Sequence, residues 1–196
     1  MLNRLSTLVV AALLVGCVDP KSRLDDFENR VVDGAPDAPP VTCGDAGPTP
    51  DINGKFLFGG IGSQGQMKDI AFLVTIEFRP NPDGSGSADL SMQPLKVSDR
   101  SPTGDPIVAK NQPINTCGRF MDVPILGLLP GDADPVIPDF PLNLDVKLEG
   151  GFVTEDFACG SLAGKANTTD VSGPFALQRV KGNQPLPDSK HDCTPP

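Results

Sequence analysis

The sequence predicts an all-β domain, folded as an antiparallel up-and-down barrel or a two-sheet sandwich of about eight strands. Apolar residues take every second position from Ile70 to Phe78 and again from Leu142 to Leu148. This period of two indicates strands with one buried face and one wet face, which is typical of antiparallel sheets. The chain also carries 21 Gly and 22 Pro among its 196 residues, which leaves no room for long helices.

The expected strands lie near residues 54–59, 69–78, 87–97, 106–110, 118–126, 140–149, 151–157 and 160–180, with the last region divided in two. Turn residues separate several of them. The segment Asn81–Gly86 supplies the positive-φ residues that a hairpin requires. Gly150 and Gly151 predict a second, two-residue hairpin turn of type I′ or II′ between Leu148 and Phe152.

The N-terminus has the layout of a secretory signal. One basic residue, Arg4, precedes an apolar run from Leu5 to Val15, and Asp19 ends the apolar character shortly afterwards. A membrane-spanning helix needs about 20 apolar residues, and this run is about half that length. It is therefore too short to remain as a transmembrane anchor.

The residues Leu14-Val15-Gly16-Cys17 resemble the lipobox of bacterial lipoproteins. The resemblance implies that residues 1–16 are removed as a signal peptide and that Cys17 is lipidated, with acyl chains such as palmitate on its sulfur and its new amine. Val18, rather than an acid, follows the cysteine, and by the same resemblance this implies sorting to the outer membrane. An ordinary signal peptide that places a cysteine after glycine is the alternative.

The mature chain divides into three parts. Residues 17–50 are expected to be the lipidated N-terminus and a flexible tether, because Pro- and Gly-rich stretches such as Asp33–Pro40 bury little. Residues 51–183 form the β domain, and residues 184–196 form a Pro-rich tail tied by Cys193. One domain is what about 180 residues ordinarily build.

The charge of the chain restricts its partners. The formal net charge is −9 at pH 7, and removal of the leader with Arg4 makes the remainder more acidic. Such a surface repels nucleic acid and anionic lipid headgroups. The expected partners are the membrane, through the lipid anchor, and an envelope component or a small ligand, with no nucleic acid.

Four cysteines remain after Cys17 is set aside, an even number that suits an oxidising compartment. They allow three disulfide pairings, of which we favour Cys43 with Cys193 and Cys117 with Cys159. No two of the four have the close spacing of a structural zinc site. We therefore expect no metal and no other cofactor.

The start of the β domain, Gly54-Lys55-Phe56, is similar to the Gly-x-Trp start of lipocalin-type barrels, although this chain contains no Trp. A lipocalin-like carrier would hold a small apolar ligand inside a partly empty barrel. The residues expected to line it are Phe72, Ile76, Leu144 and Val146.

Three patterns that could carry chemistry are weaker. Gly60–Gly65 matches GxGxxG, but a strand rather than a helix follows it, so a hairpin loop is expected and not a dinucleotide site. The single histidine, His191, lies in the tail, and no GxSxG motif accompanies it. The loop Asp83–Asp89 lacks the ligand spacing of a dedicated calcium loop.

Carboxylates are the remaining candidates for catalysis. The densest groups near apolar strands are Glu155 with Asp156 and Asp132 with Asp134; the second group also offers oxygen ligands for calcium without the dedicated spacing. The function expected is a non-catalytic binding or structural module of the cell envelope. The carrier is its alternative, and a carboxylate-dependent hydrolase is the third class.

Overall fold

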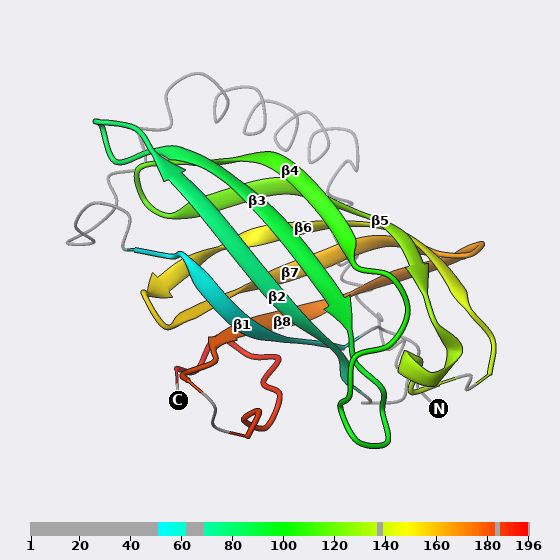
Figure 1. The fold of residues 1–196 in the computed structure, drawn as a ribbon. Coiled ribbons are helices and arrows are strands. Elements are labelled where there is room, and N and C mark those ends of the chain that lie inside the picture. Colours follow the sequence, from blue (N-terminus) through cyan, green and yellow to red (C-terminus); the bar gives the residue numbers. More distant parts are fainter. Residues whose placement is uncertain (1–50, 62–68, 137–138, 183–184, 196) are drawn as a thin grey trace, which may run out of the picture. The chain divides into compact units, whose positions relative to one another are not determined.

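The structure is a computed structural model that describes residues 51–61, 69–136, 139–182 and 185–195 (Figure 1). The expected signal peptide, Cys17, the tether, Cys43 and most of the GxGxxG segment lie outside the described residues. The strands are β1 (Gly54–Ile61), β2 (Asp69–Pro80), β3 (Gly86–Pro94), β4 (Ile107–Ile114), β5 (Arg119–Leu129), β6 (Leu142–Thr154), β7 (Phe157–Ala166) and β8 (Thr169–Arg179). One short 3-10 helix, η1, spans Gly131–Ala133.

All eight strands belong to a single antiparallel sheet in the order β4-β3-β2-β1-β8-β7-β6-β5. Strands β1 and β8 pair with each other, Phe56 opposite Arg179, so the sheet curls back on itself (Figure 1). The hydrogen-bonded ladder stays open only between β4 and β5 within the described residues. The fold is therefore a nearly closed barrel, and of the two predicted architectures the sandwich is wrong.

The predicted alternation is confirmed in β2 and β6. In β2, Phe72, Val74, Ile76 and Phe78 are buried, and the residues between them are half-buried or exposed. In β6 the residues Leu144 to Leu148 follow the same rule, with a buried residue at every second position. Because one face of each strand is covered and the other is solvated, the two-residue period of apolar side chains in the sequence matches the alternation of buried and exposed residues.

The Asn81–Gly86 turn is confirmed, since Asn81 N–H donates to Ser85 O at 2.7 Å between β2 and β3. The Gly150-Gly151 turn is wrong, because β6 runs through both glycines and ends at Thr154. A Cβ on Gly150 would lie 2.4 Å from Cys159 O on the neighbouring strand. Gly150 is thus a place where two strands approach closely, which is the other reason for glycine in a strand.

Local irregularities help the sheet curve. The β5–β6 register shifts between Phe120 and Val123, where Asp122 has a φ of 54°. Such bulges increase bending and twist in a strand. Across the open seam, Ile107 of β4 fills the space over Gly127 of β5, where a Cβ would lie 2.7 Å from Ile107 Cγ1. Side-chain packing therefore joins the two edges where the ladder does not.

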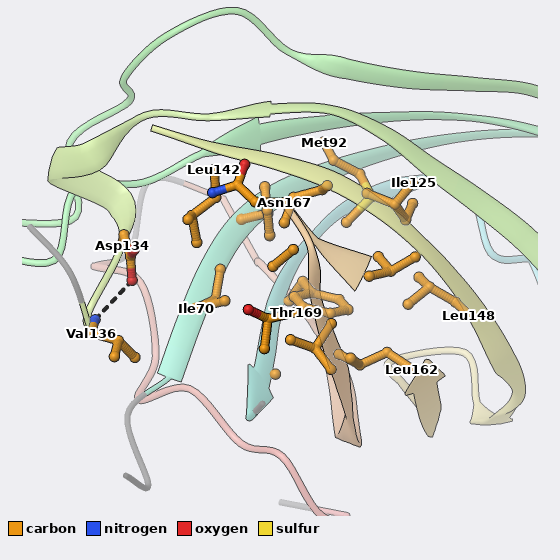
Figure 2. A pocket seen from close by; sticks show the side chains of 17 residues that line it. Ile70, Met92, Ile125, Asp134, Val136, Leu142, Leu148, Leu162, Asn167 and Thr169 are labelled. Atoms are coloured by element: carbon orange, nitrogen blue, oxygen red, sulfur yellow. Dashed lines mark hydrogen bonds between the residues drawn. The ribbon is translucent and has the colours of Figure 1, made fainter. Parts of the chain in front are cut away.

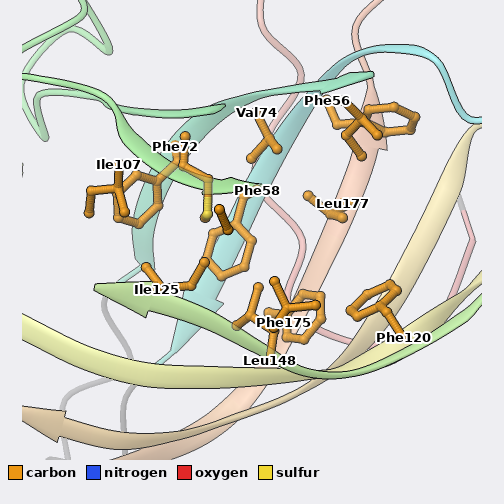
Figure 3. Close-up of a cluster of buried hydrophobic side chains, with 14 of the residues drawn as sticks. Phe56, Phe58, Phe72, Val74, Ile107, Phe120, Ile125, Leu148, Phe175 and Leu177 are labelled. Atoms are coloured by element: carbon orange, nitrogen blue, oxygen red, sulfur yellow. The ribbon is translucent and has the colours of Figure 1, made fainter. Parts of the chain in front are cut away.

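The inside of the barrel has two halves: an aromatic half, filled mainly by phenylalanine rings, and an aliphatic half, lined mainly by aliphatic side chains together with the rings of Phe58 and Phe72. Phe58 and Phe175 stack with ring centroids 5.3 Å apart (Figure 3). The ring centroid of Phe120 lies 6.2 Å from those of both Phe175 and Phe152. Phe56 contacts Phe152 edge to face at 5.8 Å. Edge-to-face and offset pairs of this kind are favourable beyond their buried area. The aromatic half is consequently filled with side chains.

The C-terminal tail returns to the outside of the barrel beside β1 and β8 (Figure 1). A disulfide joins Cys159 to Cys193, which corrects the favoured pairing of Cys117 with Cys159 and of Cys43 with Cys193. Cys117 is disulfide-bonded as well. The tail passes directly over Gly59, where a Cβ would lie 2.5 Å from the backbone oxygen of Lys190. The favoured pairing failed because it assumed that Cys193 meets the start of the domain rather than β7.

Candidate ligand-binding cavity

The aliphatic half of the barrel encloses a partly open cavity of about 170 Å³ (Figure 2). Its wall is made by residues of seven strands, β1, β2, β3, β5, β6, β7 and β8, among them Phe58, Phe72, Ile125, Leu144, Val146, Leu148 and Leu162. An eight-stranded barrel is about wide enough either to fill with side chains or to hold one small ligand. In this chain, side chains fill the aromatic half of the barrel, and the aliphatic half retains space.

The structure places three of the four residues expected to line a carrier around this cavity: Phe72, Leu144 and Val146. The fourth, Ile76, lies farther along β2 and borders a separate gap of about 20 Å³ next to Phe152 and Leu177. Ile76 shares a face with Phe72, but it lies toward the aromatic half of the barrel. Strand alternation predicts which side chains point inward, and it does not predict how far along the barrel the space extends.

Small residues at inward positions keep the cavity open. A Cβ on Gly60 would lie 2.8 Å from the Phe58 ring and 3.2 Å from Leu162. Ala166, which ends β7, contributes only a methyl group to the wall. Larger side chains at these two positions would occupy the space. Neither residue was predicted from the sequence, although a small residue among large inward-facing residues of a strand can indicate internal space.

One acidic side chain lines the cavity. Asp134 is 2% exposed, and its Oδ1 accepts a hydrogen bond from Val136 N–H at 2.8 Å. Its second oxygen, Oδ2, is buried and has no hydrogen-bond partner among the described residues. Figure 2 places Asp134 and Val136 at one end of the cavity, with Ile125 and Leu148 at the other. The lining of the cavity is thus mostly apolar, and its polar side chains are Asp134, Asn167 and Thr169.

The backbone around η1 holds Asp134 in place. Asp134 N–H donates to Gly131 O at 3.1 Å and closes the 3-10 turn. The preceding Asp132 faces outward, where it accepts a hydrogen bond from Thr103 Oγ1 at 2.8 Å, while its backbone oxygen accepts from Val97 N–H at 2.9 Å. The β3–β4 connection therefore fixes the turn that points the next acid inward.

This arrangement separates the two acids that the sequence groups together. Asp132 is exposed and Asp134 is buried. Of the described residues that line the cavity, Asp134 is the only acid. The pair of carboxylates that glycosidic hydrolysis requires is therefore not assembled at this site.

Glu155 and Asp156, the other acidic pair, lie in the turn between β6 and β7. Asp156 contacts Lys181 and lies 2.8 Å from Arg179 Nε. The hydrogen bond from the Lys181 ammonium, together with the charge of Arg179, lowers the pKa of the Asp156 carboxyl below its ordinary value. A carboxyl held in its charged form by two cations is a poor proton donor.

His191 lies beside Asp69 rather than free in solvent, with Nδ1 3.5 Å from Asp69 Oδ1. Ser189 Oγ donates to the other oxygen of Asp69 at 2.5 Å. Serine and histidine therefore both meet the carboxylate. Activation of a serine nucleophile requires a hydrogen bond from its hydroxyl to the histidine instead. We therefore interpret the contacts of Ser189 and His191 with Asp69 as holding the tail against β2.

Candidate metal ligands are engaged elsewhere. Asp83 accepts hydrogen bonds from the backbone and hydroxyl of Ser85, and Asp89 accepts from Arg79. Over the described residues no group of three His, Cys, Asp or Glu lies close enough together to hold a metal ion. In the same residues no helix is both long and apolar enough to span a membrane.

Fold and cavity together define the class: a single antiparallel eight-stranded barrel that is nearly closed and partly hollow. Comparison with known proteins yields no relative, since no family model, curated protein or solved structure matches the chain. The function is therefore inferred from the geometry of the barrel.

Proposed function

We propose that this protein is a non-catalytic binding module of the cell envelope whose barrel holds a small apolar ligand. Lipidation of Cys17 would anchor it, with the outer membrane as its location and residues 17–50 as the tether. The proposal joins the two functions expected from the sequence, a binding module and a lipocalin-like carrier. The cavity is what favours the carrier form.

The observation that carries the proposal is an apolar cavity of about 170 Å³ in an otherwise filled barrel. Protein interiors pack to about the density of organic crystals, so a void of this size loses contacts and lowers stability. An engineered apolar cavity of about 150 Å³ stays dry and binds benzene or xenon. A ligand of that size would recover the missing contacts.

The anchor is supported by the lipobox-like residues and by charge. A net charge of −9 disfavours direct adsorption to anionic headgroups. Stable attachment of an acidic domain would therefore need a covalent lipid, and a single acyl chain gives only marginal binding. Mass spectrometry of the N-terminus of the native protein tests this part: a lipid-bearing Cys17 supports it, and a retained leader contradicts it.

Ligand binding is tested by filling the cavity. We expect Ala166→Phe to place a ring in the cavity, since Ala166 lines it from the end of β7. Ala163→Phe is the matched control, because Ala163 lies on the same strand and is exposed. In an NMR titration with benzene, the methyl signals of Leu144 and Leu162 should shift in the wild type and in Ala163→Phe.

Ala166→Phe should abolish those shifts while remaining folded, which its amide spectrum will report. If benzene leaves the methyl signals of the wild type unchanged up to its solubility limit, the proposed function is wrong. The same conclusion follows if both phenylalanine variants bind benzene as the wild type does, because the ligand would then lie outside the cavity.

A further inference from the structure

The feature that the proposed function leaves unexplained is Asp134 Oδ2. This oxygen is buried at one end of an apolar cavity and has no partner among the described residues. A buried acceptor without a hydrogen bond costs about 1–3 kcal/mol, and a charged one costs more. Native proteins carry few such groups, and each calls for a physical reason.

No cation of the described chain forms an ion pair with Asp134. Lys96, in the β3–β4 connection, pairs with Asp132 instead, with its Nζ 3.7 Å from Asp132 Oδ2. Both of those side chains are well exposed, so the Lys96–Asp132 pair lies on the surface and does not involve the Asp134 carboxylate. Within the described residues, an acceptor oxygen is therefore buried in a mostly apolar cavity without a hydrogen-bond donor for it.

Two hydrogen bonds fix the position of the Asp134 side chain and backbone. Val136 N–H occupies Oδ1 at 2.8 Å, which fixes the orientation of the carboxylate. The closure of η1 by Asp134 N–H fixes its backbone. With both held, Oδ2 presents its lone pairs in a defined direction at the end of the cavity (Figure 2).

We propose that the ligand is a small amphiphile with a primary amine head. The ammonium donates a hydrogen bond to Asp134 Oδ2, and the apolar body lies against Leu144, Val146 and Leu162. This inference rests on the proposed function and specifies its ligand. An ionised carboxylate only accepts hydrogen bonds, so the head must donate, and a charged donor gives the stronger bond.

The size of the cavity limits the body of the ligand. A space of about 170 Å³ suits a single six-membered ring or a chain of similar volume, and it does not suit a long acyl chain. A carboxylate or phosphate head would meet Asp134 with like charge and is disfavoured. Arylalkylamines and short alkylamines are the ligands that satisfy both limits.

The test compares three probes that share one ring: benzylamine, toluene and benzoate. Affinities are measured on the full mature chain at about 0.15 M salt, from the methyl shifts of Leu144 and Leu162. The salt screens general attraction of a cation to an acidic protein. We expect the wild type to bind benzylamine at least about tenfold more tightly than toluene, and benzoate most weakly.

Two variants separate the specific contact from the overall charge. Asp134→Asn should bind toluene as the wild type does and lose the preference for benzylamine. Asp132→Asn removes the same charge two residues away on the surface, and it should keep the preference. Loss of the preference in Asp132→Asn would overturn the inference, because it would trace the effect to surface charge.

A wild-type measurement keeps the inference testable if Asp134→Asn does not fold. The ¹³C signal of the Asp134 carboxyl should move during the benzylamine titration and stay in place with toluene. Equal affinities for benzylamine and toluene, or an Asp134 carboxyl signal that does not shift with benzylamine, would overturn the inference. Neither result would contradict the proposed function. If none of the probes shifts the methyl signals, the proposed function fails as well.

Discussion

The Arg179 guanidinium lies over the ring of Phe56, with its central carbon 4.7 Å from the ring centroid. The two residues are partners in the β1–β8 register, so the contact joins the first strand in the sequence to the last. The same guanidinium donates to the backbone oxygens of Asp51 and Glu155 at 2.7 and 2.6 Å. One side chain thus contacts β1, the segment before it and the turn between β6 and β7.

Arg179→Lys is expected to lower the free energy of unfolding by about 2 kcal/mol, because an ammonium cannot supply the planar fork and leaves carbonyl oxygens without donors. Urea denaturation followed by circular dichroism measures the change. Lys181→Met is the control, since Lys181 also contacts Asp156 from an exposed position. Its loss should cost no more than about 0.5 kcal/mol, and equal losses for the two variants would refute the role given to Arg179.

The disulfide between Cys159 and Cys193 closes a loop with a sequence separation of 34. By the chain-entropy model, removing it should lower the free energy of unfolding by about 3–4 kcal/mol. The double variant Cys159→Ser, Cys193→Ser avoids a free thiol and should also increase amide hydrogen exchange at Gly59, which the tail covers. Unchanged exchange there would mean that the tail docks without the bond.

Asp89 should make the barrel sensitive to acid. Hydrogen bonds from Arg79, and then from Asn111 N–H, lower the pKa of its carboxyl from 3.8 to about 2. Because the folded pKa lies below the unfolded one, the stabilisation is fully present above about pH 4 and is lost as pH falls toward 2. Carboxyl ¹³C titration should return the low pKa, and Asp89→Asn should flatten the dependence of stability on pH in this window. An Asp89 carboxyl that titrates near 3.8 in the folded protein would contradict the contact.

Gly160 is expected to tolerate no side chain. A Cβ there would lie 2.0 Å from Glu149 O and 2.6 Å from Gly150 Cα, both backbone atoms. Gly160→Ala should therefore lower the free energy of unfolding by about 3 kcal/mol or separate β6 from β7 locally. Gly151→Ala is the matched control, because its nearest neighbour is the flexible Arg119 Cγ at 3.1 Å. Thermal melts of similar midpoint for both variants would rule out the close approach.

Much of the fold is readable from the sequence because burial in an antiparallel barrel repeats with the pleat. The alternate apolar residues from Phe72 to Phe78 and from Leu144 to Leu148 are buried, as their spacing predicts. Gly150 and Gly151 misled the assignment, because the same residue type serves a tight turn and a close approach of strands. Only the partner strand distinguishes the two uses, and it is not visible in a local window.

The candidate site was only partly accessible from the sequence. Alternation identified Phe72, Leu144 and Val146 as inward residues, and the structure places them around the cavity. The burial of Asp134 depends on η1 and on its contacts with the β3–β4 connection, which are nonlocal. The pairing of Cys159 with Cys193 is likewise set by the path of the tail over β1.

The central claim, that the barrel holds a small ligand in its aliphatic half, is tested most directly by crystals of the protein under xenon pressure. Xenon enters dry apolar cavities and has a strong anomalous signal. We expect an anomalous peak between Leu144 and Leu162, and no such peak in crystals of Ala166→Phe. Wild-type crystals with no peak at this place, or with ordered water filling it, would contradict the claim.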